Sequence, residues 1–107
     1  MEVLTEEDFQ TKIQGDTPIF IDFWAQWCRP CLKIAPLIED LAEEYKGRMR
    51  FGKCNTDENP AVATKFRIMS IPYFIIFHEG KPVEQFIGAQ PKKNFVEVIE
   101  KVLKRLE

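Results

Sequence analysis

The chain has 107 residues, of which 45% are hydrophobic and 30% charged, and its formal net charge is -2 at pH 7. This length suits one domain over residues 1–107, and the composition excludes a disordered, fibrous or low-complexity chain. The charge offers no basic field for a nucleic acid, and the longest apolar run, Tyr73 to Phe77, is too short to cross a bilayer. The acidic amino terminus has no signal-type apolar stretch, so we expect a cytoplasmic protein. We also expect a monomer.

The amino-terminal third predicts two strands around one short helix. Val3 to Leu4 is a candidate strand. Thr5 and Asp8 fit a capping box that begins a short amphipathic helix, which ends near Gly15. Ile19 to Trp24 is apolar on both alternating faces, which is typical of a central strand covered on both sides.

A long amphipathic helix is predicted next, from about Cys28 to Lys46, because apolar residues recur there at helical spacing. Gly47 ends it, and Pro36 inside it is expected to kink it. Arg50 to Thr56 predicts another strand. Asn59 with Pro60 then suits the N-cap and first turn of a short helix through Phe66.

The remaining residues predict a hairpin and a final helix. Tyr73 to His78 and Pro82 to Ile87 are strand patterns joined by the turn pair Glu79-Gly80. Phe95 to Leu106 carries the apolar stripe of a helix. The order β-α-β-α-β-α-β-β-α predicts an α/β fold with one mixed sheet and helices on both faces.

The chemistry of the sequence is concentrated in a Cys-x-x-Cys pair. Cys28 and Cys31 stand where the central strand ends and the long helix begins. The positive end of a helix lowers a cysteine pKa from about 8.5 into a range of roughly 3.5 to 7.5, and the spacing allows a short disulfide. Asp22 is the only charge on the apolar strand, and burial there is expected to raise its pKa.

Five stretches of the sequence match one known family and together cover nearly the whole chain. They are Phe23-Trp24-Ala25-Gln26-Trp27-Cys28-Arg29-Pro30-Cys31, Ala35-Pro36, Asp57-Glu58-Asn59-Pro60, Ser70-Ile71-Pro72 and Ile87-Gly88-Ala89. In these stretches the chain resembles the thioredoxin family, which implies the thioredoxin fold, a central mixed sheet flanked by helices on both faces. It also implies a thiol-disulfide oxidoreductase that reduces protein disulfides without metal or cofactor and is itself reduced by thioredoxin reductase.

The resemblance assigns roles to the residues around the cysteine pair. It implies that Cys28 is the exposed nucleophile that attacks a substrate disulfide, and that Cys31 is the buried resolving thiol. Asp22 matches the family's buried proton acceptor, and Lys53 matches a lysine placed near that aspartate.

A substrate groove is implied as well. Pro72 corresponds to the family's cis-proline, which faces the disulfide, and Ile71 and Gly88 lie in stretches that the family uses beside it. Trp27, next to Cys28, is interpreted as part of the same binding surface.

The sequence departs from the family between and around the cysteines. Arg29-Pro30 replaces the usual Gly-Pro, and Leu32 replaces the usual lysine after the second cysteine. The Arg29 guanidinium beside Cys28 is expected to favour the Cys28 thiolate and to make the disulfide more oxidising. Arg29, Pro30 and Lys53 are the candidate redox-tuning residues. Ser70 and Tyr73 also differ from common family residues, which leaves substrate preference open.

Three other interpretations stay open. A zinc site would need further ligands, and the only other Cys or His residues are Cys54, expected to be buried, and His78, neither in a paired spacing. The same chemistry could serve a glutaredoxin-like or isomerase-like enzyme, as the changes at Arg29 and Tyr73 suggest. The Trp27 surface could also belong to a binding module without turnover.

Overall fold

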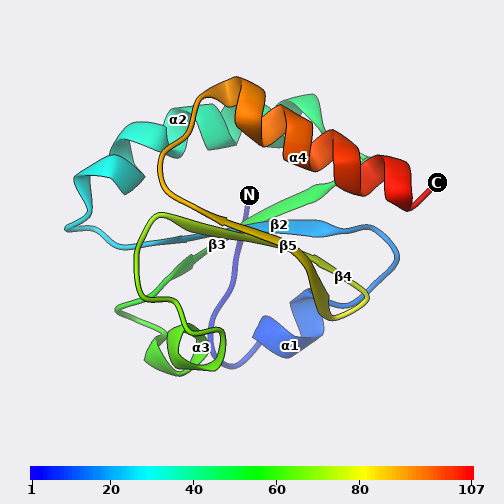
Figure 1. Ribbon diagram of the computed structural model, residues 1–107. Helices are drawn as coiled ribbons and strands as arrows, with labels where there is room; N and C mark the ends of the chain where they lie inside the picture. The colour runs from blue at the N-terminus through cyan, green and yellow to red at the C-terminus, as the bar shows by residue number, and fades with distance from the viewer.

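The computed structural model describes residues 1–107 and contains five strands and four helices (Figure 1). In chain order they are β1 (Glu2–Val3), α1 (Phe9–Lys12), β2 (Ile19–Trp24), α2 (Arg29–Glu44), β3 (Arg50–Asn55), α3 (Pro60–Lys65), β4 (Tyr73–His78), β5 (Lys81–Ile87) and α4 (Lys92–Arg105). The predicted element order is confirmed, and β2 and β4 have the predicted bounds.

The strands form one mixed sheet in the order β1-β3-β2-β4-β5. β1 and β2 both pair with β3 in parallel, whereas β4 runs antiparallel to β2 and β5 antiparallel to β4. Helices α2 and α4 cover one face of the sheet, and α1 and α3 cover the other (Figure 1). The prediction of helices on both faces of a mixed sheet is therefore confirmed.

Two apolar cores lie on the two faces of the sheet, and β2 contributes to both because successive strand residues point to opposite sides. Phe20 belongs to the core beneath α2 and α4, where its ring stacks 4.8 Å from that of Phe51. Ile19, Ile21 and Phe23 belong to the core beneath α1 and α3. The continuous apolar run of β2 is explained by this burial on both sides.

The predicted ends of several elements shift by one to three residues. The first strand is Glu2–Val3 rather than 3–4, α1 ends at Lys12, and α2 continues through Pro36 to Glu44. Asn59 occupies the N-cap position of α3, but its side chain makes no cap hydrogen bond. Its Oδ1 instead accepts from the Glu6 N–H at 3.0 Å, so the residue joins the amino-terminal segment to α3.

The β4–β5 turn has the backbone of a tight hairpin, since Glu79 and Gly80 both have positive φ, at 51° and 83°. Their N–H groups donate to the carbonyls of Gly15 and Ile13, which fix the turn against the segment after α1.

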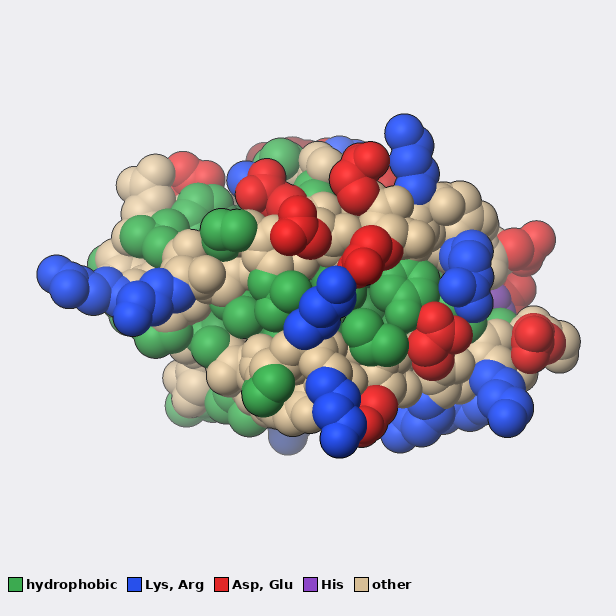
Figure 2. All heavy atoms as spheres, turned by 90° about the horizontal axis from the view of Figure 1, so that it is seen from above, with side chains coloured by type: hydrophobic (Ala, Val, Ile, Leu, Met, Phe, Trp, Pro, Cys, Tyr) green, Lys and Arg blue, Asp and Glu red, His purple; other side chains and the backbone are tan.

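The face formed by α2 and α4 carries interspersed acidic and basic side chains with apolar side chains between them (Figure 2). Ion pairs tie its elements together, such as Lys92 to Glu44 at 2.9 Å, between α4 and α2. No helix is both long and apolar enough to cross a membrane.

Candidate active site

The site is built on the amino end of α2. Cys28 is the N-cap residue, with extended backbone angles, and its Sγ accepts the N–H of Cys31 at 3.2 Å. The two cysteines form a disulfide with their Cα atoms 5.3 Å apart, within the ordinary range for such a bond. Pro30 lies in the first turn of the helix, where its missing N–H removes no intrahelical bond.

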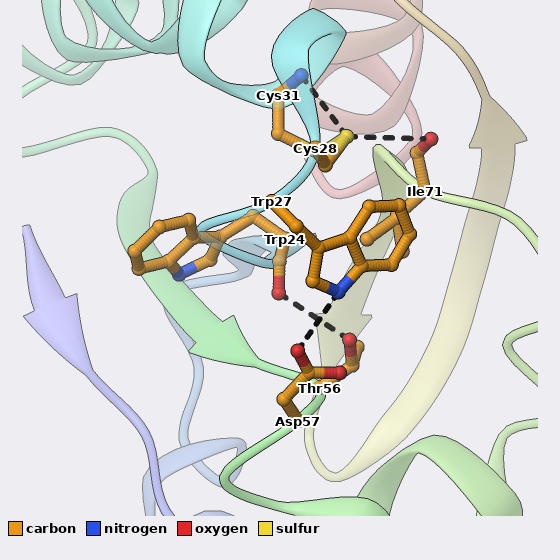
Figure 3. Close-up of a disulfide and its surroundings, with 7 residues drawn as sticks. All are labelled: Trp24, Trp27, Cys28, Cys31, Thr56, Asp57 and Ile71. Atoms are coloured by element: carbon orange, nitrogen blue, oxygen red, sulfur yellow. Dashed lines mark hydrogen bonds between the residues drawn. A yellow bond between two sulfur atoms is a disulfide. The ribbon is translucent and has the colours of Figure 1, made fainter.

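The expectation that Cys28 is exposed is wrong for the disulfide form. Cys28 is 3% exposed and Cys31 is 2% exposed, so accessibility does not distinguish the two residues. The backbone before Pro72 covers Cys28, whose Sγ lies 3.8 Å from the carbonyl oxygen of Ile71 (Figure 3). This contact comes from a residue 43 positions further along the chain, so the local motif could not reveal it.

The predicted groove residues do meet beside the disulfide. The Ile71–Pro72 peptide bond is cis, as the resemblance implied. Gly88 donates its N–H to the Pro72 carbonyl at 2.8 Å and has a φ of 92°. A side chain would strain that backbone, so glycine allows the segment after β5 to lie beside Pro72.

Trp27, next to Cys28, is an exposed ring, with 68% of the residue accessible. Its Nε1–H donates to Asp57 Oδ2 at 2.8 Å, which fixes the orientation of the indole (Figure 3). Trp27 and Ile71, together with Met69, line a hollow of about 360 Å³. Met69 is 90% exposed. Neither Asp57 nor Met69 was predicted from the sequence as part of the site, although both lie in or next to stretches that carried the resemblance.

Asp22 lies behind the disulfide, in the middle of β2. It is 5% exposed, and its Oδ1 has no hydrogen-bond partner. Burial raises the pKa of this carboxyl from 3.8 to about 7, with a smaller opposing effect from the positive charge of Lys53. Asp22 and Cys31 line the same cavity, which has a volume of about 370 Å³. The predicted rise in the pKa of Asp22 is thus supported by its surroundings.

Lys53 faces this cavity as well, but it forms no ion pair with Asp22. The two residues are register partners in the parallel pair β2–β3. The Lys53 Nζ instead lies 5.4 Å from the centre of the Trp24 ring.

The other predicted residues lie outside this network. Arg29 is exposed at the first position of α2 and takes part in none of the ion pairs of the molecule. Cys54 is free and buried on β3, as expected, and desolvation raises the pKa of its thiol to about 12. No group of three or more His, Cys, Asp or Glu side chains could hold a metal ion.

These features define a class of protein. A disulfide closed over one helical turn, held at the amino end of a helix and lying against the Ile71 carbonyl, is a site for thiol-disulfide exchange. On a mixed sheet with helices on both faces, the site belongs to a dithiol oxidoreductase of the α/β class.

Comparison with known proteins gives the family. The thioredoxin family model matches residues 1–101. Thioredoxins from the Staphylococcus aureus strains Mu50, MW2 and N315 are each 45% identical to this chain over 100 residues, which cover 94% of this chain and 95% of theirs. The chain belongs to the thioredoxin family. It is a protein-disulfide reductase that works through reversible oxidation of the Cys28–Cys31 dithiol.

Proposed function

We propose that Cys28 is the attacking thiol and Cys31 the resolving thiol. The Cys28 thiolate attacks one sulfur of a protein disulfide, forms a mixed disulfide and displaces the first substrate thiolate. The Cys31 thiolate then attacks Cys28 Sγ, displaces the second substrate thiolate and forms the Cys28–Cys31 disulfide. The substrate gains two electrons and the protein loses two.

The observation that carries this assignment is the asymmetry of the two sulfur environments. Cys28 Sγ accepts a backbone N–H at the amino end of α2 and lies against the Ile71 carbonyl of the groove. Such a position favours a thiolate. Cys31 Sγ belongs to the first turn of the helix and lines the cavity that holds Asp22, away from the contact with Ile71.

Asp22 serves in this proposal as the proton acceptor for Cys31. The Cys31 thiol must lose its proton before it can attack the mixed disulfide. A carboxyl with a pKa of about 7 is well matched to accept that proton near neutral pH. Trp27, Ile71, Pro72 and Gly88 form the groove that receives the substrate backbone.

Residues near the site tune the redox equilibrium of the Cys28–Cys31 disulfide. Arg29 adds positive charge at the first position of α2, which stabilises the reduced, thiolate form and makes the disulfide more oxidising. Pro30 fixes the backbone of the same turn, and Lys53 acts on Asp22 through its positive charge.

Membership of the family supports the partners and cellular setting that we propose. The oxidised protein receives electrons from a thioredoxin reductase, a flavin enzyme, and needs no metal or cofactor of its own. It acts in the cytoplasm as a monomer with one domain over residues 1–107. A glutathione-linked, glutaredoxin-like or isomerase-like role is the alternative that the charge of Arg29 favours.

Trapping tests the roles of the two cysteines. The Cys31→Ser variant should accumulate mixed disulfides with a disulfide-containing protein such as insulin, and peptide mapping should locate them at Cys28. The Cys28→Ser variant should trap nothing. Equal trapping by both variants would refute the assignment. Turnover with NADPH and thioredoxin reductase, compared with turnover with glutathione, tests the electron donor.

A further inference from the structure

Asp22 and Lys53 are neighbours that do not pair. They stand opposite each other in the parallel pair β2–β3, so their side chains leave the same face of the sheet. Both line the cavity beneath α2. A buried carboxyl is stabilised by a nearby ammonium, yet Asp22 Oδ1 has no hydrogen-bond partner and no ion pair joins the two residues.

Trp24 lines the cavity together with Asp22 and Lys53. Trp24 is two residues after Asp22 on β2, so its side chain leaves the same face. Its ring lines the same cavity, with the Lys53 Nζ 5.4 Å from the ring centre. An ammonium over the face of an indole is attracted by the negative face of the ring, and the attraction grows when water is partly excluded. In Figure 3 this indole extends to the opposite side from that of Trp27.

We propose that Trp24 is a positioning residue whose indole face holds the Lys53 ammonium away from the Asp22 carboxyl. The carboxyl then lines the cavity beside Cys31 without a cationic partner. Its proton affinity depends on this arrangement, because desolvation is opposed only by the charge of Lys53, which forms no ion pair with the carboxyl. The inference rests on the proposed role of Asp22 as proton acceptor for Cys31.

The other charged groups of the cavity do not replace Lys53. Glu39 faces the cavity from α2 and carries a negative charge, so it offers Asp22 no cationic partner. Cys31 carries no charge in the disulfide form. Lys53 is thus the only cationic side chain among the residues that line the cavity; the amino-terminal ammonium of Met1 lies in the same lining, and Lys53 is the one charge that opposes the desolvation of Asp22. Trp24 therefore acts by setting the distance between the Lys53 ammonium and the Asp22 carboxyl, and so the strength of their attraction.

Four variants test the proposal in the oxidised protein: Trp24→Leu, Trp24→Phe, Lys53→Met and the double variant Trp24→Leu with Lys53→Met. The Asp22 carboxyl is titrated in each by carbon-13 NMR. Trp24→Leu should lower the pKa of Asp22 by about one unit, a tenfold change in its proton equilibrium, because Lys53 is free to approach it. Trp24→Phe keeps an aromatic face and should show less than half of that change.

The Lys53→Met background separates positioning from simple exposure to water. Removing the Lys53 charge should raise the pKa of Asp22. In the double variant, Trp24→Leu should not lower the pKa of Asp22 below its value in Lys53→Met. If Trp24→Leu lowers the pKa equally with and without Lys53, the ring acts only by excluding water and the proposal is refuted. An unchanged pKa in Trp24→Leu would refute it as well. Lys33→Met, an exposed α2 lysine outside the cavity lining, is the matched control and should leave the titration unchanged.

The pH profile of insulin reduction separates this inference from the proposed function. The Asp22 titration requires no turnover, so it tests the placement of Lys53 by itself. If Asp22 is the proton acceptor, the acidic limb of the rate profile should move in Trp24→Leu by the same amount as the pKa. A pKa that falls while the rate profile stays unchanged would uphold the positioning role of Trp24 and refute the role proposed for Asp22.

Discussion

Replacing Asp22 with Asn should stabilise the oxidised protein at alkaline pH and should lose this effect as the pH falls. Burial raises the pKa of Asp22 from 3.8 to about 7. The folded state therefore binds this proton more tightly than the unfolded state. The stability that Asp22 contributes as a neutral acid is complete below the unfolded pKa, decreases as the pH rises, and is lost above the folded pKa.

The size of the effect follows from the same shift. One pKa unit corresponds to about 1.4 kcal/mol, so a shift of about three units makes the ionised form about 4 kcal/mol less stable in the fold. The stability difference between Asp22→Asn and the natural sequence should therefore be about 4 kcal/mol larger at pH 8.5 than at pH 4. Comparing the two pH values removes the constant cost of burying the new amide.

Urea unfolding of the oxidised proteins across this pH range is the assay. Asp40→Asn is the control, because Asp40 is an exposed carboxylate on α2, and its substitution should change stability by less than about 0.5 kcal/mol. A stability difference that does not vary with pH, or that favours Asp22→Asn more at pH 4 than at pH 8.5, would refute the reasoning. It would mean that Asp22 is ionised at low pH in the folded protein.

Three further predictions concern Arg29, Trp27 and Cys54. Arg29→Gly should lower both the reduction potential and the thiolate fraction of Cys28, because it removes positive charge from the first turn of α2; an unchanged or higher potential in a glutathione redox titration would contradict this. Trp27→Ala should lower kcat/KM for insulin by about tenfold, as expected for a loss of about 1.4 kcal/mol of binding, while the exposed position of Trp27 predicts a change in stability of less than about 1 kcal/mol. Equal losses of activity and stability would show that the ring is structural. Cys54 should resist iodoacetamide in the folded protein at pH 8 and react in urea, since burial raises the pKa of its thiol to about 12; mass spectrometry of the alkylated protein checks this, and rapid labelling of Cys54 in the native state would disprove it.

Element order was predictable because the apolar patterns were strong and local. The run Ile19–Trp24 is buried on both faces of a central strand, so nearly every residue is apolar. The pair Glu79-Gly80 suits the positive φ values of a tight hairpin turn, and the turn lies there. The order β1-β3-β2-β4-β5 depends on contacts between distant segments, which no local pattern encodes.

The chemistry of the site was predictable only in part, for similar reasons. The burial of Asp22 follows from its place on an apolar strand. The cover over Cys28 comes from the Ile71 carbonyl, and the place of the Lys53 ammonium over Trp24 depends on the rotamers of a long side chain. Neither contact can be inferred from the spacing of residues in the sequence. Such contacts decide the accessibility and proton affinity of groups whose identity the sequence already indicates.

The order of the strands also protects the molecule against aggregation. β2 and β4, whose apolar runs would readily pair with other chains, occupy inner positions of the sheet. The outer positions belong to β1, which is two residues long, and to β5, which begins with Lys81 and Pro82 and pairs through a register shift. Short, charged or irregular outer strands are poor templates for a further strand. The protein can therefore contain a destabilising buried acid in β2 while the outer strands of its folded state present few backbone groups with which another chain could pair.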